Sequence, residues 1–241
     1  MRSDTYKWLD DIQDNHWWLN ARKEIVTNLF EKYSDSDLLN ILEIGFGTGG
    51  VLEAVSRYGQ AWGMDSAEAI KYAQKRYPDT RLFEGRLPDE VPFPENSVDR
   101  VIMLDVLEHI EDDSLSLKKI AGLLRPGGML FLTVPAFSFL WGKHDMDAMH
   151  RRRYSRREII QKLKGAGFDI VKCSYFNMFL FFPIALAKMS NKIRTSSVEK
   201  KEFPQVIENL FYNIFRSEKI FLERFNLPFG ISIICIVQKN K

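Results

Sequence analysis

The chain has few of the features that mark secreted or membrane-spanning proteins. Its 241 residues include only two cysteines, Cys173 and Cys235. Both lie in apolar runs, so we expect buried free thiols, with a disulfide as the alternative. The longest apolar run, residues 178–187, has about half of the ~20 residues that cross a bilayer. The first 20 residues contain several acids and no signal-like apolar core, which predicts a cytoplasmic protein.

An excess of charge of either sign is also lacking. The chain has 34 basic and 32 acidic residues, a formal net charge of +2, so nucleic acid is not an expected partner. The 45% of apolar and 27% of charged residues are typical of a globular protein, and the length fits one domain.

The most informative segment that is present is LNILEIGFGTGG at residues 39–50, an apolar strand that runs into glycines. Glycines let the chain turn sharply and approach a ligand closely, while the next helix start offers unpaired N–H groups. Asp65 closes the next predicted strand, about 20 residues on, where an acid is suited to bind ribose hydroxyls. These features predict a site for a nucleotide-type cofactor.

Glu43 discriminates between two such cofactors. Gly45, Gly47 and Gly50 also satisfy the G-x-G-x-x-G spacing of dinucleotide-binding proteins. A carboxylate beside the loop would repel a pyrophosphate but attract the ammonium and sulfonium of S-adenosylmethionine (SAM). The charge therefore favours SAM, and an NAD(P)-dependent oxidoreductase is the alternative.

Short apolar runs alternate with helical patterns along the chain. This alternation predicts a doubly wound, mostly parallel seven-stranded α/β sheet of Rossmann-like type, with an antiparallel last strand and a helical insertion at 176–230 between the last two strands. Predicted strands cover residues 39–44, 61–65, 80–84, 98–104, 129–134, 168–174 and 231–237; predicted helices cover 51–58, 67–77, 114–124 and 155–164. Acids at four strand ends, Glu43, Asp65, Glu84 and Asp105, should converge on one rim.

Four segments together resemble class I SAM-dependent methyltransferases of the ubiquinone/menaquinone-methyltransferase-like type, also known as methyltransferase types 11 and 12. They are ILEIGFGTGG, GMDSAEAI, SVDRVIMLDVLEHIEDD and LLRPGGMLFLTVP, within residues 38–135. HWWLNAR and HDMDAMHRRRYSRREIIQKLKGAGF resemble a subgroup associated with cell-surface polysaccharide or lipid metabolism. The resemblance implies one domain, 1–241, made of an N-terminal helical lid (1–37), a SAM-binding core (38–135), a substrate lid with strand six (136–175), the aromatic-rich insertion (176–230) and the last strand (231–241).

The resemblance also implies roles for single residues. Glu43 would accept a hydrogen bond from the methionine ammonium, Asp65 would bind the ribose, and the segment from Asp105 and Val106 to His109 would lie under the methionine portion. Gly45, Gly47 and Gly49 would let the loop approach the ligand. The family commonly has an Asp after the glycine that follows strand three, but this chain has Arg86. Adenine recognition would then fall to the backbone around Arg86 and Leu87.

Three histidines, His109, His144 and His150, lie in segments expected to flank the catalytic rim. Methyl transfer from a sulfonium is an in-line displacement, so a base is needed only if the acceptor must lose a proton. Histidine is the natural proton acceptor near neutrality; packing or capping is the alternative for each.

A D-x-x-E-H string, Asp105, Glu108 and His109, would share one face of a helix and could together ligate a divalent metal. The same string occurs in methyltransferases that need no metal, so the expected site contains none.

Substrate contacts are expected from the arginine-rich run at 151–157 and from the HWW segment. Arg152, Arg153 and Tyr154 would hold an acidic group of the acceptor, the alternative being a solvated helix start. Trp18 would belong to a lid that excludes water, the alternative being core packing.

The insertion contains ten of the 18 phenylalanines. Aromatic stripes at helical spacing usually face a core, so we expect core or homodimer packing, with peripheral membrane contact as the alternative. In that case Lys192, Arg194, Lys200 and Lys201 would reach lipid headgroups. The sequence thus predicts a methyltransferase for a small-molecule or lipid-linked acceptor; a catalytically silent SAM-binding subunit or sensor is the alternative from another class.

Overall fold

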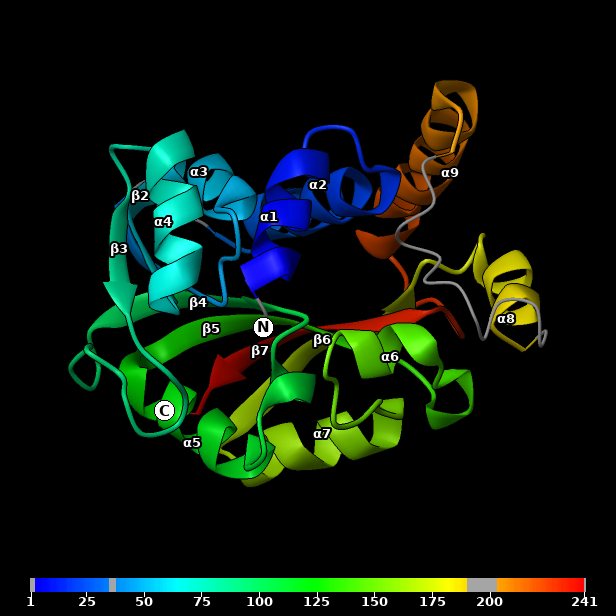
Figure 1. The fold of residues 1–241 in the computed structure, drawn as a ribbon. Helices are drawn as coiled ribbons and strands as arrows, with labels where there is room; N and C mark the ends of the chain where they lie inside the picture. Colours follow the sequence, from blue (N-terminus) through cyan, green and yellow to red (C-terminus); the bar gives the residue numbers. More distant parts are fainter. Residues whose placement is uncertain (1–2, 35–37, 190–202, 241) are drawn as a thin grey trace.

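The structure is a computed structural model that describes residues 3–34, 38–189 and 203–240. One seven-stranded sheet with the order β3-β2-β1-β4-β5-β7-β6 runs through its centre, between two layers of helices (Figure 1). The strands are β1 (Leu39–Ile44), β2 (Gly59–Asp65), β3 (Arg81–Glu84), β4 (Val98–Leu104), β5 (Leu124–Pro135), β6 (Phe168–Phe176) and β7 (Ser232–Lys239). β7 is antiparallel to both of its neighbours and the other pairs are parallel, which confirms the predicted fold class.

The helices divide between the two faces of the sheet. They are α1 (Ser3–Ile12), α2 (Trp17–Lys32), α3 (Gly50–Val55), α4 (Ala67–Arg76), α5 (Asp113–Leu123), α6 (Lys143–Asp147), α7 (Arg156–Gly165), α8 (Phe181–Met189) and α9 (Gln205–Leu222). In Figure 1, α1 to α4 and α9 lie above the sheet and α5 to α7 below it. Apolar strand residues alternate between the two cores, because neighbouring side chains of a strand point to opposite faces: Leu42 packs with the α5 and α7 layer, and Ile41 with the α2 and α9 layer.

The strand order reverses between β1 and β4. After β1 the chain moves outward to β2 and β3, then returns to β4 on the other side of β1. Such a reversal leaves a crevice outside the carboxyl ends of the strands, where ligands bind in doubly wound sheets. The predicted strand boundaries agree closely with those observed, except that β5 begins at Leu124, because Leu124 pairs with Val98 ahead of a register shift to the next pair, Arg100 and Met129.

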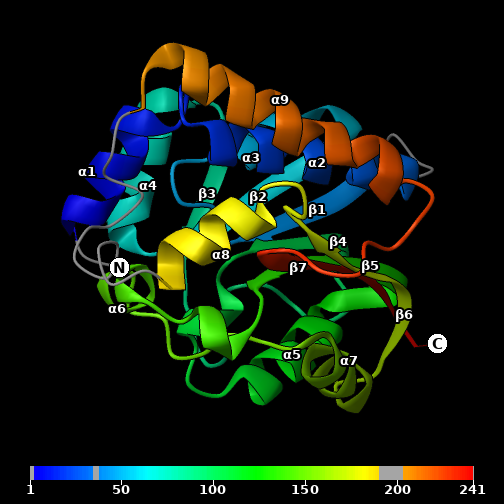
Figure 2. The same ribbon diagram turned by 90° about the vertical axis from the view of Figure 1, so that its right-hand side faces the viewer.

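The insertion contributes a long helix to the core. α9 packs along α2 (Figure 2), and Trp17 meets Phe211 and Phe215 edge-on, with ring centroids 5.5 and 6.0 Å apart. Phe215 is fully buried, so one face of α9 packs as predicted, whereas Phe221 and Phe225 are exposed. The four basic residues expected to reach lipid, at 192, 194, 200 and 201, lie outside the described residues.

The two cysteines face each other on β6 and β7. Cys173 is the register partner of Cys235, both are buried, and both are free thiols. This confirms the expectation of buried thiols. Among the described residues, no helix is both long and apolar enough to span a bilayer.

Candidate active site

A cavity of about 1210 Å³ opens at the carboxyl ends of the strands. Its walls include the four acids predicted to converge there: Glu43, Asp65, Glu84 and Asp105. The switch in strand order places them together although they are up to 62 residues apart in sequence. The N-terminal helices and the segment from α6 to His150 complete the walls.

The glycine loop follows β1 directly. Gly45, Gly47 and Gly49 have φ values of 74°, 57° and 90°, a region that side chains disfavour. A Cβ on Gly45 would lie 2.2 Å from the side chain of Val106, so the loop needs a glycine to pack against that segment. A Cβ on Gly47 would meet no protein atom within 4 Å, and Gly47 lines the cavity. Gly49, in contrast, is the N-cap of α3 and does not line the cavity.

Glu43 supplies the clearest electrostatic feature of the site. Its side chain is buried, and its Oε2 atom has no hydrogen-bond partner. Burial, reinforced by the Asp65 charge and opposed by Arg22, raises the pKa of Glu43 to about 8. A buried carboxylate without a partner is unfavourable, and a cationic group placed beside it would relieve that penalty. The residue therefore fits the ammonium of a methionine moiety.

Asp65 already accepts three hydrogen bonds. Its carboxylate receives the backbone N–H groups of Gly47 (3.0 Å) and Ser66 (2.7 Å), and the hydroxyl of Tyr6 (3.2 Å). Burial raises the pKa of Asp65, and these hydrogen bonds oppose the rise. Tyr6 thus ties α1 to the acid expected to hold a ribose. Nothing in the sequence pattern indicated a role for Tyr6.

The wall expected to hold the adenine is formed by the turn after β3. Arg86 is exposed and Leu87 is buried, and both line the cavity. The backbone N–H and carbonyl of Arg86 are bonded to Glu90.

Asp105 and Val106 lie at the opposite end of the cavity. Asp105 has a φ of 56° and forms an ion pair with Arg22 from α2. The guanidinium of Arg22 lies over the ring of Trp18, 4.4 Å from its centroid. Trp17 and Trp18 both line the cavity, and both also pack against the core that α2 and α9 share. Arg22 belongs to the HWWLNAR segment but its contact with Asp105 was not foreseen.

The three histidines expected near the catalytic rim are brought together. His150 lies between the other two, with ring centroids 4.8 Å from His109 and 5.4 Å from His144, and all three line the cavity. The Nδ1 atom of His150 is 2.9 Å from the Asp145 carboxylate. Burial is the main cause that lowers the pKa of His109 to about 4, and the nearby His150 contributes to the same shift.

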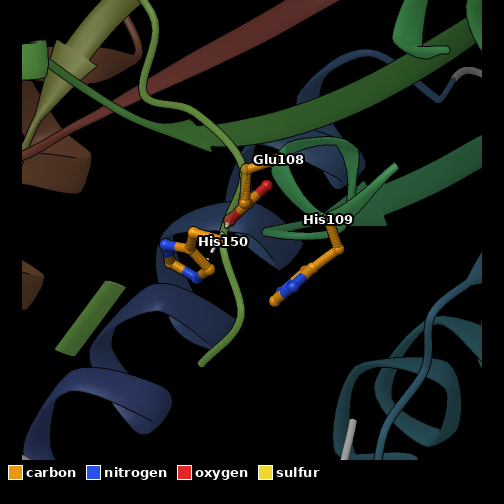
Figure 3. Close-up of side chains that lie close together, drawn as sticks. All are labelled: Glu108, His109 and His150. Atoms are coloured by element: carbon orange, nitrogen blue, oxygen red, sulfur yellow. Dashed lines mark ion pairs between the residues drawn. The ribbon is translucent and has the colours of Figure 1, made fainter. Parts of the chain in front are cut away.

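Glu108 is fully buried between these rings, and neither of its carboxylate oxygens has a hydrogen-bond partner (Figure 3). Its Oε1 atom is 3.9 Å from Nε2 of His150. The D-x-x-E-H string does not form an α-helix as predicted: Asp105 precedes a short 3-10 turn at Leu107–His109 and pairs with Arg22. The acid and histidine that share a site are Glu108 and His109, joined by His150.

The predicted substrate contacts of the arginine-rich run need correction. Tyr154 is fully buried and donates to Asp113 (3.0 Å), and Arg152 pairs with the same carboxylate (2.9 Å). Neither residue lines the cavity. Arg153 lines it, but its guanidinium is buried and donates to Asp145 (2.7 Å) and to a backbone carbonyl. Buried carboxylates need cationic or hydrogen-bonding partners, and these side chains serve that need.

Comparison with known proteins gives the family. The family model "Methyltransferase domain" matches residues 42–132, the part of the chain that holds the glycine loop, Asp65 and the turn at Leu107–His109. Residues 42–132 therefore match the class I SAM-dependent methyltransferases. Its cofactor is S-adenosylmethionine, which agrees with the unpartnered Glu43 carboxylate and the open face of Gly47 described above.

Individual members of the methyltransferase family are distant in sequence. A "Probable S-adenosylmethionine-dependent methyltransferase" of Mycolicibacterium smegmatis is 26% identical over 66% of this chain and 62% of its own length. Demethylmenaquinone methyltransferase of Tropheryma whipplei is 30% identical over 51% of this chain and 49% of its own length. The matches thus span less than two thirds of these relatives.

Solved structures share the fold of this chain over its whole length. Phosphoethanolamine N-methyltransferase 2 of Haemonchus contortus matches with a TM-score of 0.66 and 17% identity, covering 100% of this chain and 59% of that one. A chain in the complex of the Haloferax volcanii Trm112 methyltransferase activator with a methyltransferase matches with a TM-score of 0.65 and 18% identity, covering 100% of both. At these identities the likeness establishes the fold alone.

Proposed function

We propose that this protein is a SAM-dependent methyltransferase that acts on a small-molecule or lipid-linked acceptor. The observation that carries the proposal is Glu43, a buried carboxylate with one oxygen that lacks a hydrogen-bond partner, beside a glycine loop at the strand-order reversal. A cationic cofactor satisfies this group, whereas a pyrophosphate would add a second negative charge. The family of residues 42–132 points in the same direction.

Within this proposal, the chain binds and orients both reactants. Glu43 holds the ammonium of the methionine portion, Asp65 the ribose, and the cavity wall at Arg86 and Leu87 the adenine. SAM supplies a methyl group on a sulfonium, an already activated leaving group. Alignment of the acceptor with that methyl and exclusion of water by Trp18 then lower the barrier. When the acceptor must lose a proton, the group of His109, His144 and His150 receives it.

Recognition of an acidic acceptor would depend on Arg151. Of the arginine-rich run, Arg151 is the member that lines the cavity with its side chain half exposed. It pairs with Glu111 at 3.4 Å, whose side chain is 83% exposed. Such exposed ion pairs are weak, so Arg151 can exchange that partner for a carboxylate or phosphate of the acceptor.

A lipid-linked acceptor is supported by α8. Ile184 of this helix lines the cavity, while Phe182 and Leu186 on the same helix are 64% and 70% exposed. α8 thus presents one apolar residue to the cavity and two to the surface, and exposed apolar groups call for a partner. We expect co-sedimentation with anionic liposomes that is lost in Phe182→Ser/Leu186→Ser. A shift from dimer to monomer in that variant, with no liposome binding, would instead assign the surface to a homodimer.

Capture of the acceptor tests the proposal directly. The protein is incubated with deuterated SAM and a cell lysate, and mass spectrometry follows the label. We expect a labelled small molecule or lipid, absent for Glu43→Gln. SAM binding without turnover in any extract would indicate the silent subunit or sensor, and calorimetric uptake of NAD(H) but not SAM would overturn the cofactor assignment itself.

A further inference from the structure

Three side chains at the inner wall of the cavity form a compact group of metal-ligand type. One ligand atom each from Glu108, His109 and His150 lies within 4.8 Å of the other two, and Figure 3 shows both imidazoles beside the carboxylate. Ligand atoms in a tetrahedral zinc site are about 3.3 Å apart, given bonds of about 2.0–2.2 Å. Side-chain shifts of about 1 Å would bring the three groups into that geometry. We propose that they bind one divalent transition-metal ion.

The charge balance around Glu108 leaves room for a cation. Glu108 is fully buried, and both of its oxygens lack a partner. The two arginines whose charge reaches it are committed to other acids, Arg22 to Asp105 and Arg153 to Asp145. A buried carboxylate needs a proton or a cation. Two neighbouring imidazoles offer lone pairs to the same point, and a metal ion satisfies all three groups at once.

Hydrogen bonds to groups outside the cluster hold both imidazoles in place. Asp145 also accepts from the guanidinium of Arg153 and the backbone N–H of Gly142. It is therefore an acceptor, and the Nδ1–H of His150 donates to it, which leaves the lone pair of a neutral ring on Nε2, the atom facing Glu108. His109 hydrogen-bonds the backbone of Met149, a residue with a φ of 58°. Carboxylates and carbonyls orient metal-bound histidines in this way.

Two imidazoles and one carboxylate indicate the kind of metal. This donor set suits zinc and neighbouring transition metals, whereas magnesium and calcium prefer oxygen ligands alone. Three protein ligands leave a further position open toward the cavity, as in catalytic zinc sites.

The consequence for chemistry rests on the proposed function. An acceptor hydroxyl bound at the open position would lose its proton more readily, with His144 as the receiving base. Its oxygen would then form the O–C bond as the C–S bond of SAM breaks.

Metal binding can be measured without any methyl acceptor. Tag-free protein is stripped with a chelator, dialysed, and titrated with Zn²⁺ by calorimetry; Co²⁺ is added in parallel and its visible absorption recorded. We expect one equivalent bound, and a loss of about 100-fold or more in affinity for Glu108→Gln and His150→Ala. Asp145→Asn, which keeps the three ligands, should lose about 10- to 100-fold. His16→Ala is the matched control for loss of a cavity histidine and should bind metal as the parent does.

SAM binding is recorded for every variant as a check of fold. His150→Ala should bind SAM within about threefold of the parent, since Glu43 holds the cofactor and His150 lies outside the segment expected under the methionine portion. If one metal ion binds per chain but no methyl transfer is detected, the metal site stands and the proposed function is overturned. No binding tighter than about 10 µM, or binding unchanged in both Glu108→Gln and His150→Ala, would overturn the site.

Discussion

At the scale of single residues, the cofactor site depends on a carboxylate placed where it is unfavourable in the free protein. Glu43 is buried at the end of β1 with one oxygen unpartnered, and its pKa is raised to about 8. Near neutral pH the free protein therefore carries a largely protonated Glu43. A bound ammonium favours the ionised form, so SAM binding and proton release from this residue are coupled.

We expect Glu43→Gln to weaken SAM binding by about 100-fold or more, because a neutral amide cannot pair with the buried ammonium. Calorimetry between pH 6.5 and 8, in two buffers of different ionisation enthalpy, should show proton release for the parent and none for the variant. Glu53→Gln changes an exposed acid on α3 and is the control. Equal SAM affinity in Glu43→Gln and the parent would remove the assigned role of Glu43.

At the scale of elements, the N-terminal helices are held by contacts with distant parts of the chain. α2 packs against α9 through Trp17 and Phe215, and the backbone N–H of Trp17 donates to Glu208 of α9 (2.9 Å). α1 is linked to the cofactor site by the hydroxyl of Tyr6, which reaches Asp65 and Ser66. Through α9, the insertion thus stabilises the position of α2, the helix that carries Trp18 and Arg22.

Phe215→Ala should lower the free energy of unfolding by about 3–5 kcal/mol, because it opens a cavity in a fully buried layer. Leu210→Ala, at a 54% exposed position of the same helix, should change it by no more than about 0.5 kcal/mol. Urea titration followed by circular dichroism measures both. If both variants lost a similarly small amount of unfolding free energy, α9 would not be part of the core that covers the sheet.

The link between Tyr6 and Asp65 makes α1 sensitive to the cofactor. Limited proteolysis within residues 3–22 should slow when SAM is added, because SAM fills the cavity that these helices line. In the absence of SAM, Tyr6→Phe should be cleaved faster than the parent and Tyr58→Phe at the parental rate. Cleavage that SAM leaves unchanged would count against a lid.

At the scale of the whole molecule, buried acids shape the response to pH. Glu43 and Glu218 lie in separate parts of the fold, and burial raises their pKa values to about 8 and about 7. In the unfolded chain both ionise near 4.5. Above that pH the folded state holds protons that the unfolded state has lost, so each rise in pH lowers stability until the folded pKa is passed. The pKa of His109 is lowered, so this residue has the opposite effect: it makes the folded state more stable as the pH rises, mainly below about pH 6.5.

The free energy of unfolding of protein free of SAM and metal should fall by about 2 kcal/mol between pH 6.5 and 8. Chemical denaturation at each pH measures it. The double variant Glu43→Gln/Glu218→Gln should show a weaker dependence, with a remainder from Glu108, whose pKa burial also raises. SAM should reduce the dependence by pairing with Glu43. A flat profile in the parent would mean that both acids are already ionised at pH 6.5.

Local pattern was sufficient to predict the sheet and the cofactor loop. The apolar runs, the glycines after Ile44 and the acids at strand ends are set by residues close in sequence, and strand alternation then places Glu43 and Asp65 on one rim. Backbone conformation and the spacing of buried apolar residues depend on neighbours in the sequence, so both can be predicted from the sequence alone.

Only the tertiary structure decided which partners the charged groups take. The run at 151–157 predicted a substrate clamp, but Arg152 and Arg153 pair with Asp113 and Asp145. Asp105, Glu108 and His109 were expected to share one face of a helix, but the fold sets Asp105 apart and places His150, 41 residues after His109, beside the other two. An ion pair or a ligand set depends on distances of a few ångströms between segments that meet after folding, and sequence spacing alone does not determine those distances.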